Sequence, residues 1–218
     1  ELQSLMREPF LLQLILTILP TLTQETRTHT FSRSDVYARF MSSWFEKEVR
    51  RLQRAQGLKG FSPFEAIAIM DRYACELGFE MQVEKTQVAV RHPFVPTVSL
   101  VDRSREAIKV EARHLKHDPW ERFFEAAHQP SRQALKIGLR GGPIKALGEL
   151  GYAFMHKSFQ EYFAAKELID RLFEVEGPIP VTHPLNRSAI RDRSTISFLL
   201  DKIEQDPEER LKKRLMEV

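Results

Sequence analysis

Hydrophobic side chains recur at helical spacing over most of this sequence, with a change of pattern in its second half. Residues 1–22 are apolar on almost every side, which predicts a helix buried on all faces. Within it, Pro9 suits a first helical turn, where its missing N–H costs nothing. The next run, residues 34–52, predicts an amphipathic helix capped by Ser32 or Ser34. Its apolar stripe comprises Val36, Tyr37, Phe40, Met41, Trp44, Phe45, Val49 and Leu52.

A third helix and a pair of strands are predicted next. Ser62-Pro63 offers a cap followed by a first-turn proline, which favours a helix start. Residues 86–118 mix prolines, charges and short β-branched runs, and we expect them to form an insertion. Two strands are predicted, at Ala134–Leu139 and at Leu150–Met155. The residues Gly141-Gly142-Pro143 between them are typical of a turn. Together they predict a β-hairpin.

The second predicted strand runs directly into a helix. At His156 the alternation ends, and Ser158 with Glu161 three residues later has the spacing of a capping box. The N-terminus of a helix carries unpaired N–H groups and a partial positive charge, so a phosphate would be stabilised there. This makes His156 a candidate binding residue. The alternative is that His156 has only a structural role at the junction of the strand and the helix. The helix continues through Phe159, Tyr162, Phe163, Ile169 and Leu172.

After this helix, residues 177–180 are typical of a stiff linker, and a further helix is predicted over 191–205. Its inward positions are Ile196, Phe198, Leu199, Leu200 and Ile203. A last helix is predicted to begin near Asp206 and to end at Val218.

The run from Phe154 to Ala165 resembles the end of the winged-helix domain in NACHT-type NTPases of the STAND class, which include the NOD-like receptors. In this chain it stands as Phe154-Met155-His156-Lys157-Ser158-Phe159-Gln160-Glu161-Tyr162-Phe163-Ala164-Ala165. The family's histidine at this place touches the β-phosphate of bound ADP, and the resemblance carries that role to His156. Residues 7–12 are similar to the segment that opens the family's small helical domain, whose proline packs against adenine; here that proline is Pro9.

The resemblance implies a mainly α fold of three parts. Residues 1–58 would be a small helical domain, and residues 59–174 a winged-helix domain with a β-wing and an insertion at 86–118. Residues 175–218 would be a linker and the start of a second helical region. Because the chain opens without Met, inside a helical pattern, we expect it to be a piece of a longer protein whose nucleotide-binding core precedes it.

Composition narrows the class of protein. The chain has 218 residues, of which 42% are hydrophobic, enough for one large or two small domains. Its net charge of +3 does not by itself indicate a nucleic-acid partner. The single cysteine, Cys75, excludes an internal disulfide and fits a reducing compartment, and we expect it to pack in the core. No signal peptide pattern is present, and the apolar run Phe10–Leu19 is shorter than the ~20 residues that span a bilayer. We therefore expect a cytoplasmic protein without membrane contact.

Two kinds of chemistry are not expected. The sequence has no Gly-x-x-x-x-Gly-Lys-(Ser/Thr) loop, so it should not hydrolyse a nucleotide and is not expected to be an enzyme. His114, His117, Asp118 and His128 have some of the spacing of zinc ligands, but no second ligand cluster is evident, and we expect no metal.

The resulting hypothesis is the regulatory part of a signalling NTPase. It would contact ADP or ATP held mainly by the core of the same parent chain. It would also control a switch from a closed state to an open one that assembles with protein partners and with further copies. Two alternatives stay open: a winged helix that binds nucleic acid, and a helical scaffold for protein interaction. Glu161, Glu167 and Asp170 make the helix after His156 acidic, so we consider nucleic acid unlikely.

Overall fold

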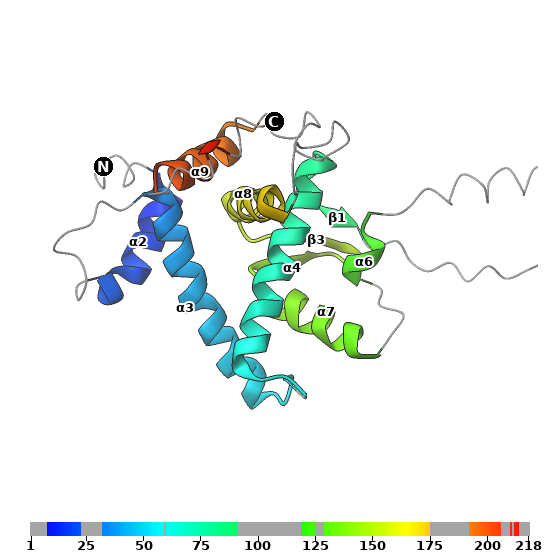
Figure 1. Ribbon diagram of the computed structural model, residues 1–218. Helices are drawn as coiled ribbons and strands as arrows, with labels where there is room; N and C mark the ends of the chain where they lie inside the picture. Colours follow the sequence, from blue (N-terminus) through cyan, green and yellow to red (C-terminus); the bar gives the residue numbers. More distant parts are fainter. Residues whose placement is uncertain are drawn as a thin grey trace, which may run out of the picture.

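The structure is a computed structural model that describes residues 8–22, 32–58, 60–90, 119–124, 129–174, 192–205, 210, 212 and 213. It is mainly helical with a small antiparallel sheet, as predicted (Figure 1). The elements are α2 (Pro9–Leu22), α3 (Arg33–Arg54), α4 (Pro63–Val83), β1 (Ala89–Val90), α6 (Glu121–Phe124), α7 (Gln129–Gly141), β2 (Ile144–Leu147), β3 (Gly151–Phe154), α8 (Lys157–Glu174) and α9 (Arg193–Glu204).

Two of the long helices begin at capping boxes. The Ser32 hydroxyl accepts the N–H of Asp35, whose carboxylate accepts the N–H of Ser32 in return. Ser62 and Glu65 form the same reciprocal pair at the start of α4, with Pro63 in the first turn. Of the two caps predicted for α3, Ser32 is the one used and Ser34 lies inside the helix, and the predicted start at Ser62 is confirmed.

The sheet has the strand order β1-β3-β2, with every pair antiparallel. Strands β2 and β3 form the hairpin, with Ile144 opposite Phe154. Its turn contains Gly148 at a φ of +68°, a conformation that glycine adopts without steric cost. Along the chain the hairpin of β2 and β3 stands between α7 and α8, and β1 adds to the free side of β3.

The prediction of a strand at Ala134–Leu139 is wrong, because these residues lie in α7. Gly141, which suggested a turn, is the last residue of α7, and together with Gly138 it permits close helix packing. A Cβ built on Gly138 would lie 2.5 Å from the ring of Tyr73, and one on Gly141 would lie 2.5 Å from the side chain of Met70, both on α4. The indole N–H of Trp44 donates to the carbonyl of Gly141 at 3.0 Å, which ties this end of α7 to α3.

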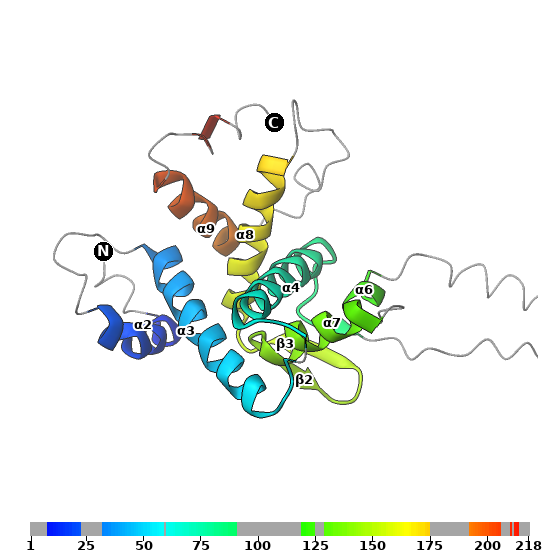
Figure 2. The ribbon, with the colours of Figure 1, turned by 60° about the horizontal axis from the view of Figure 1, so that its bottom comes forward.

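Helix α8 is the centre of the molecule. It packs against α4 on one side and against α9 on the other, while α2 packs on α3 (Figure 2). Gly78 lets α4 approach it, since a Cβ there would lie 3.0 Å from the carbonyl oxygen of Gln160. One hydrophobic core runs through these helices. Its fully buried large side chains include Leu11, Tyr37, Met70, Phe123, Phe163, Leu172 and Phe198.

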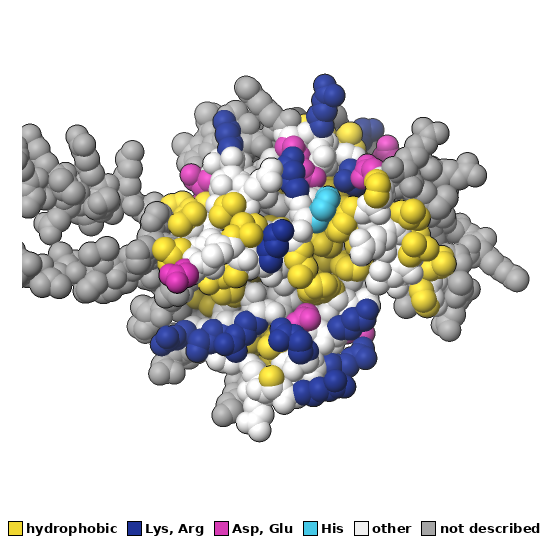
Figure 3. All heavy atoms as spheres, turned by 180° about the vertical axis from the view of Figure 1, so that it is seen from behind, with side chains coloured by type: hydrophobic (Ala, Val, Ile, Leu, Met, Phe, Trp, Pro, Cys, Tyr) yellow, Lys and Arg dark blue, Asp and Glu magenta, His cyan; other side chains and the backbone are white. Residues whose placement is uncertain are grey.

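Two predictions of burial need correction. Helix α2 buries Leu11, Leu14, Ile15 and Ile18, but Leu16 and Leu19 remain 59% and 46% exposed. Hydrophobic side chains accordingly gather on the surface over α2 (Figure 3). Of the inward positions predicted for α9, Phe198 and Leu199 are buried, Ile196 and Ile203 are intermediate, and Leu200 is exposed.

Several predicted features lie outside the described residues. These are most of the insertion at 86–118, the linker at 177–180, most of the last helix and the zinc-ligand candidates His114, His117, Asp118 and His128. Within the described part of the chain no cluster of His, Cys, Asp and Glu could hold a metal ion. No helix described there combines the length and hydrophobicity needed to cross a bilayer.

Candidate functional site

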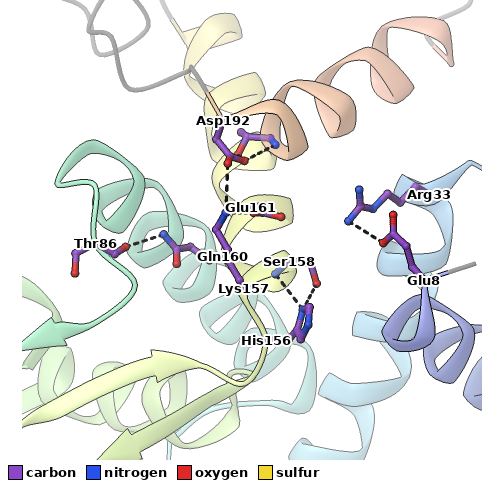
Figure 4. Close-up of polar contacts among 10 residues, drawn as sticks. Glu8, Arg33, Thr86, His156, Lys157, Ser158, Gln160, Glu161 and Asp192 are labelled. Atoms are coloured by element: carbon purple, nitrogen blue, oxygen red, sulfur yellow. Dashed lines mark hydrogen bonds and ion pairs between the residues drawn. The ribbon is translucent and has the colours of Figure 1, made fainter.

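His156 lies between β3 and α8, in the position of the helix cap. Because α8 begins at Lys157, Ser158 is inside the first turn and the predicted Ser158 cap is wrong. The imidazole of His156 caps the helix instead. Its Nδ1 accepts the backbone N–H of Ser158 at 3.2 Å and lies 2.6 Å from the Ser158 hydroxyl (Figure 4). A ring nitrogen thus satisfies one of the free N–H groups at the helix N-terminus.

This cap fixes the protonation of the ring. A nitrogen that accepts an N–H bond carries no proton, so the ring proton sits on Nε2 and the Ser158 hydroxyl donates to Nδ1. Partial desolvation of the ring, opposed by the charge of Glu161, lowers the pKa of His156 below its usual value. At neutral pH the side chain is therefore an uncharged N–H donor whose donor atom is on the edge of the ring opposite the cap.

Phe10 holds the ring from the other side. The Phe10 and His156 rings are stacked with centroids 3.8 Å apart and planes 9° apart. Phe10 also makes an edge contact with Phe159 at 5.4 Å. Since Phe10 follows Pro9, the start of α2 meets the start of α8 here. The two predicted binding residues, Pro9 and His156, are both exposed at this junction. Phe10 was missed as a site residue, although it stands inside the segment that contains Pro9.

An ion pair lies next to this junction. Arg33, the first residue of α3, is 3.5 Å from Glu8, which immediately precedes α2 (Figure 4). Its guanidinium stands over the ring of Phe198 at 4.7 Å and near that of Tyr37 at 5.8 Å. Within the described residues, the buried side-chain N and O atoms without a hydrogen-bond partner are Arg33 Nε and the Tyr37 hydroxyl. Burial raises the pKa of Tyr37, so its hydroxyl stays protonated.

The neighbours of His156 in the motif have structural contacts. Lys157 pairs with the buried Glu161 at 2.8 Å and with Asp192 at 3.3 Å. Asp192 in turn caps α9 by accepting the N–H of Thr195. Gln160 donates to the carbonyl of Thr86 at 2.9 Å. The charge of Lys157 is thus balanced by two carboxylates. The N–H of the His156 ring is therefore the donor that this turn offers to a ligand.

The arrangement can hold an anion or a flat ring. The Ser158 hydroxyl lies 2.6 Å from the imidazole, as a nucleophile lies beside a base, but Ser158 is only 4% exposed and is not open to a substrate. The junction offers the Nε2–H donor of His156, the positive end of the α8 dipole, and the exposed Pro9 close to an aromatic stack. Cys75 is buried as predicted, and burial raises the pKa of its thiol. A thiol in that state packs as a small hydrophobic side chain.

Comparison with protein-family models, with curated proteins and with solved structures finds no match.

Proposed function

We propose that this chain is the regulatory part of a STAND-class NTPase, with a small helical domain and a winged helix that respond to the bound nucleotide. His156 donates its Nε2–H to a phosphate of ADP, and Pro9 packs against the base. The nucleotide-binding core belongs to the same longer parent chain and supplies most of the contacts. The parent is a cytoplasmic signalling protein that oligomerises on activation.

The observation that carries the proposal is that Nδ1 accepts the backbone N–H of Ser158. An accepting Nδ1 carries no proton, so the ring proton is on Nε2 and is directed away from the cap. A ring with this orientation is prepared to donate before any ligand arrives, so little side-chain entropy is lost on binding. The stack on Phe10 holds the same orientation.

In this proposal nucleotide controls the shape of the molecule through the α2–α8 junction. His156 belongs to the winged helix and Phe10 to the helical unit, so a ligand that binds at this junction contacts both parts. ADP then stabilises the arrangement in which α2 and α8 meet. Exchange for ATP changes the contacts at the terminal phosphates and favours an open arrangement, in which new surfaces are free for assembly. The exposed leucines of α2 suit a face that the core covers.

Two substitutions in the intact parent separate the donor from the cap. His156→Asn keeps an acceptor for the Ser158 N–H, since Asn is a strong cap residue, but removes the Nε2–H. In His156→Gln the longer side chain places an amide N–H donor farther from the backbone, but glutamine is a poor helix cap. If the proposal is right, His156→Asn loses a contact worth roughly 1.5–3 kcal/mol, so ADP dissociates about ten- to a hundredfold faster. Assembly should then no longer require the activating ligand.

The control is the stability of each variant. His156→Asn should unfold at a similar denaturant concentration to the wild type, whereas His156→Gln should be less stable but retain more ADP affinity. If folded His156→Asn protein releases ADP at the wild-type rate, His156 only caps the helix and does not bind the nucleotide.

A further inference from the structure

Helix α7 presents a row of basic side chains to solvent. Arg132, Lys136 and Arg140 follow one another at intervals of four residues, so they lie on one face of the helix, and all three are exposed. Its buried face packs on α4 through Ile137, Gly138 and Gly141. The helix contains no acidic residue. None of these three cations has an acidic partner among the described residues.

A second row continues the first on α3. Lys47, Arg51 and Arg54 are exposed and share one side of that helix. The two rows are joined where the Arg51 guanidinium donates to the carbonyl of Arg140 at 2.9 Å. Arg51 also pairs with Glu48 at 2.6 Å. Figure 3 shows Lys and Arg side chains gathered in a band over α7 and the adjoining end of α3. These six residues are called the basic surface below.

We propose that the basic surface binds the phosphate backbone of double-stranded nucleic acid without reading its sequence. The sequence analysis considers nucleic acid unlikely because α8 is acidic, but the helix that precedes the β2–β3 hairpin is α7, and it is basic. An α-helix with its side chains is ~10–12 Å across and fits the ~12 Å major groove of DNA. Phosphate contacts from Lys and Arg supply affinity but no base readout.

The chemistry of the surface favours a polyanion over an acidic protein or a membrane. Protein interfaces depend on buried aromatic or aliphatic anchors, and membrane surfaces on apolar insertion. The exposed large hydrophobic residues of the described chain include none from α3 or α7. Gln133, the polar side chain between Arg132 and Lys136, donates to the carbonyl of Gly57 at 2.8 Å and is not free to read a base edge.

The test uses the 218-residue chain and two 20-base-pair duplexes of unrelated sequence, with fluorescence anisotropy followed between 50 and 200 mM salt. We expect similar affinities for both, with Kd about 10⁻⁶–10⁻⁴ M near physiological salt. Four or five phosphate contacts predict a slope of log K against log salt of about −4. The triple variant Arg132→Gln, Lys136→Gln, Arg140→Gln should bind roughly ten- to a hundredfold more weakly, with a slope shallower by about 2–3.

The matched control is Arg72→Gln, Lys85→Gln, Arg193→Gln, which removes the same amount of charge from exposed positions outside the basic surface. It should bind nearly as well as the wild type. Equal loss in both triple variants, or no binding at 50 mM salt, would overturn the proposal. So would tighter binding to a polyglutamate peptide or to vesicles containing phosphatidylserine, because either result would assign the surface to another partner. Circular dichroism melts confirm that both variants fold.

This inference does not depend on His156. The triple variant leaves the α2–α8 junction intact, so ADP release in the parent should not change. Failure of either proposal therefore leaves the other standing.

Discussion

The imidazole of His156 lies flat on the ring of Phe10, with centroids 3.8 Å apart. This stack joins the first turn of α2 to the residue that precedes α8. The same imidazole caps the N-terminus of α8 through Nδ1. One side chain thus connects α2 to α8 and caps a helix.

Replacement of Phe10 by Leu should weaken the junction without leaving a large cavity. The aromatic pairs with His156 and Phe159 are lost, and aromatic pairs contribute about 0.5–1.5 kcal/mol beyond their buried area. We expect a loss of that size in the free energy of unfolding by urea. Phe64→Leu is the matched control, because Phe64 is 80% exposed and its ring has little packing to lose. A similar loss in both variants would mean that the stack contributes nothing specific.

The stability of the chain should depend on pH through His156. The pKa of this residue is lowered in the folded state, so the folded chain disfavours the protonated ring. The stabilisation is fully present above the unfolded-state pKa of about 6.5 and is lost as the pH falls through the lower folded-state pKa. Protonation of Nδ1 also removes the acceptor for Ser158. Melting temperatures measured between pH 7.5 and 5 should therefore fall more steeply for wild type than for His156→Asn, and parallel curves would contradict the assignment.

Addition of one methyl group at Gly138 should destabilise the packing of α7 on α4. In Gly138→Ala the new Cβ would lie 2.5–2.7 Å from three atoms of Tyr73. The Tyr73 hydroxyl donates to the carbonyl of Phe123 at 3.0 Å, which holds the ring in place. Overpacking of this kind costs about 1–3 kcal/mol, against a gain of up to about 1 kcal/mol in helix propensity. Thermal unfolding should show a net loss, while Lys136→Ala, on the exposed face of the same helix, should show none.

Local signals made some elements predictable. The capping boxes at Ser32 and Ser62 involve residues only three positions apart, so the sequence alone contains all the information. Helix α7 was missed because Leu135, Ile137 and Leu139 alternate as in a strand. The meaning of its glycines becomes clear only beside Tyr73 and Met70, which are distant in sequence.

The candidate site was predictable in position but not in detail. The change of pattern at His156 located the strand–helix junction. The capping role went to His156 rather than Ser158 because the helix begins at Lys157, two residues earlier than a cap at Ser158 would imply. The stack with Phe10 depends on how α2 packs, and no periodicity within either segment encodes that contact.

Two tyrosines provide a paired test of the buried polar groups. The Tyr37 side chain is 0% exposed, and its hydroxyl has no hydrogen-bond partner among the described residues. Tyr37→Phe removes a group that is already desolvated and unpaired while keeping the ring contacts with Tyr162 and Phe198. Because an unpaired buried polar group costs about 1–3 kcal/mol, this variant should be as stable as wild type or more stable.

Tyr73→Phe should have the opposite sign. It deletes a hydroxyl that donates to the carbonyl of Phe123 in the core, and so leaves that carbonyl without its partner. A loss of about 1–3 kcal/mol in the free energy of unfolding is expected. Urea titrations of the two single variants under identical conditions compare the same chemical change at two buried sites. If Tyr37→Phe destabilises the chain as much as Tyr73→Phe does, the Tyr37 hydroxyl makes a hydrogen bond in solution, with Ser158 or Arg33 as the nearby candidates that also act on its pKa.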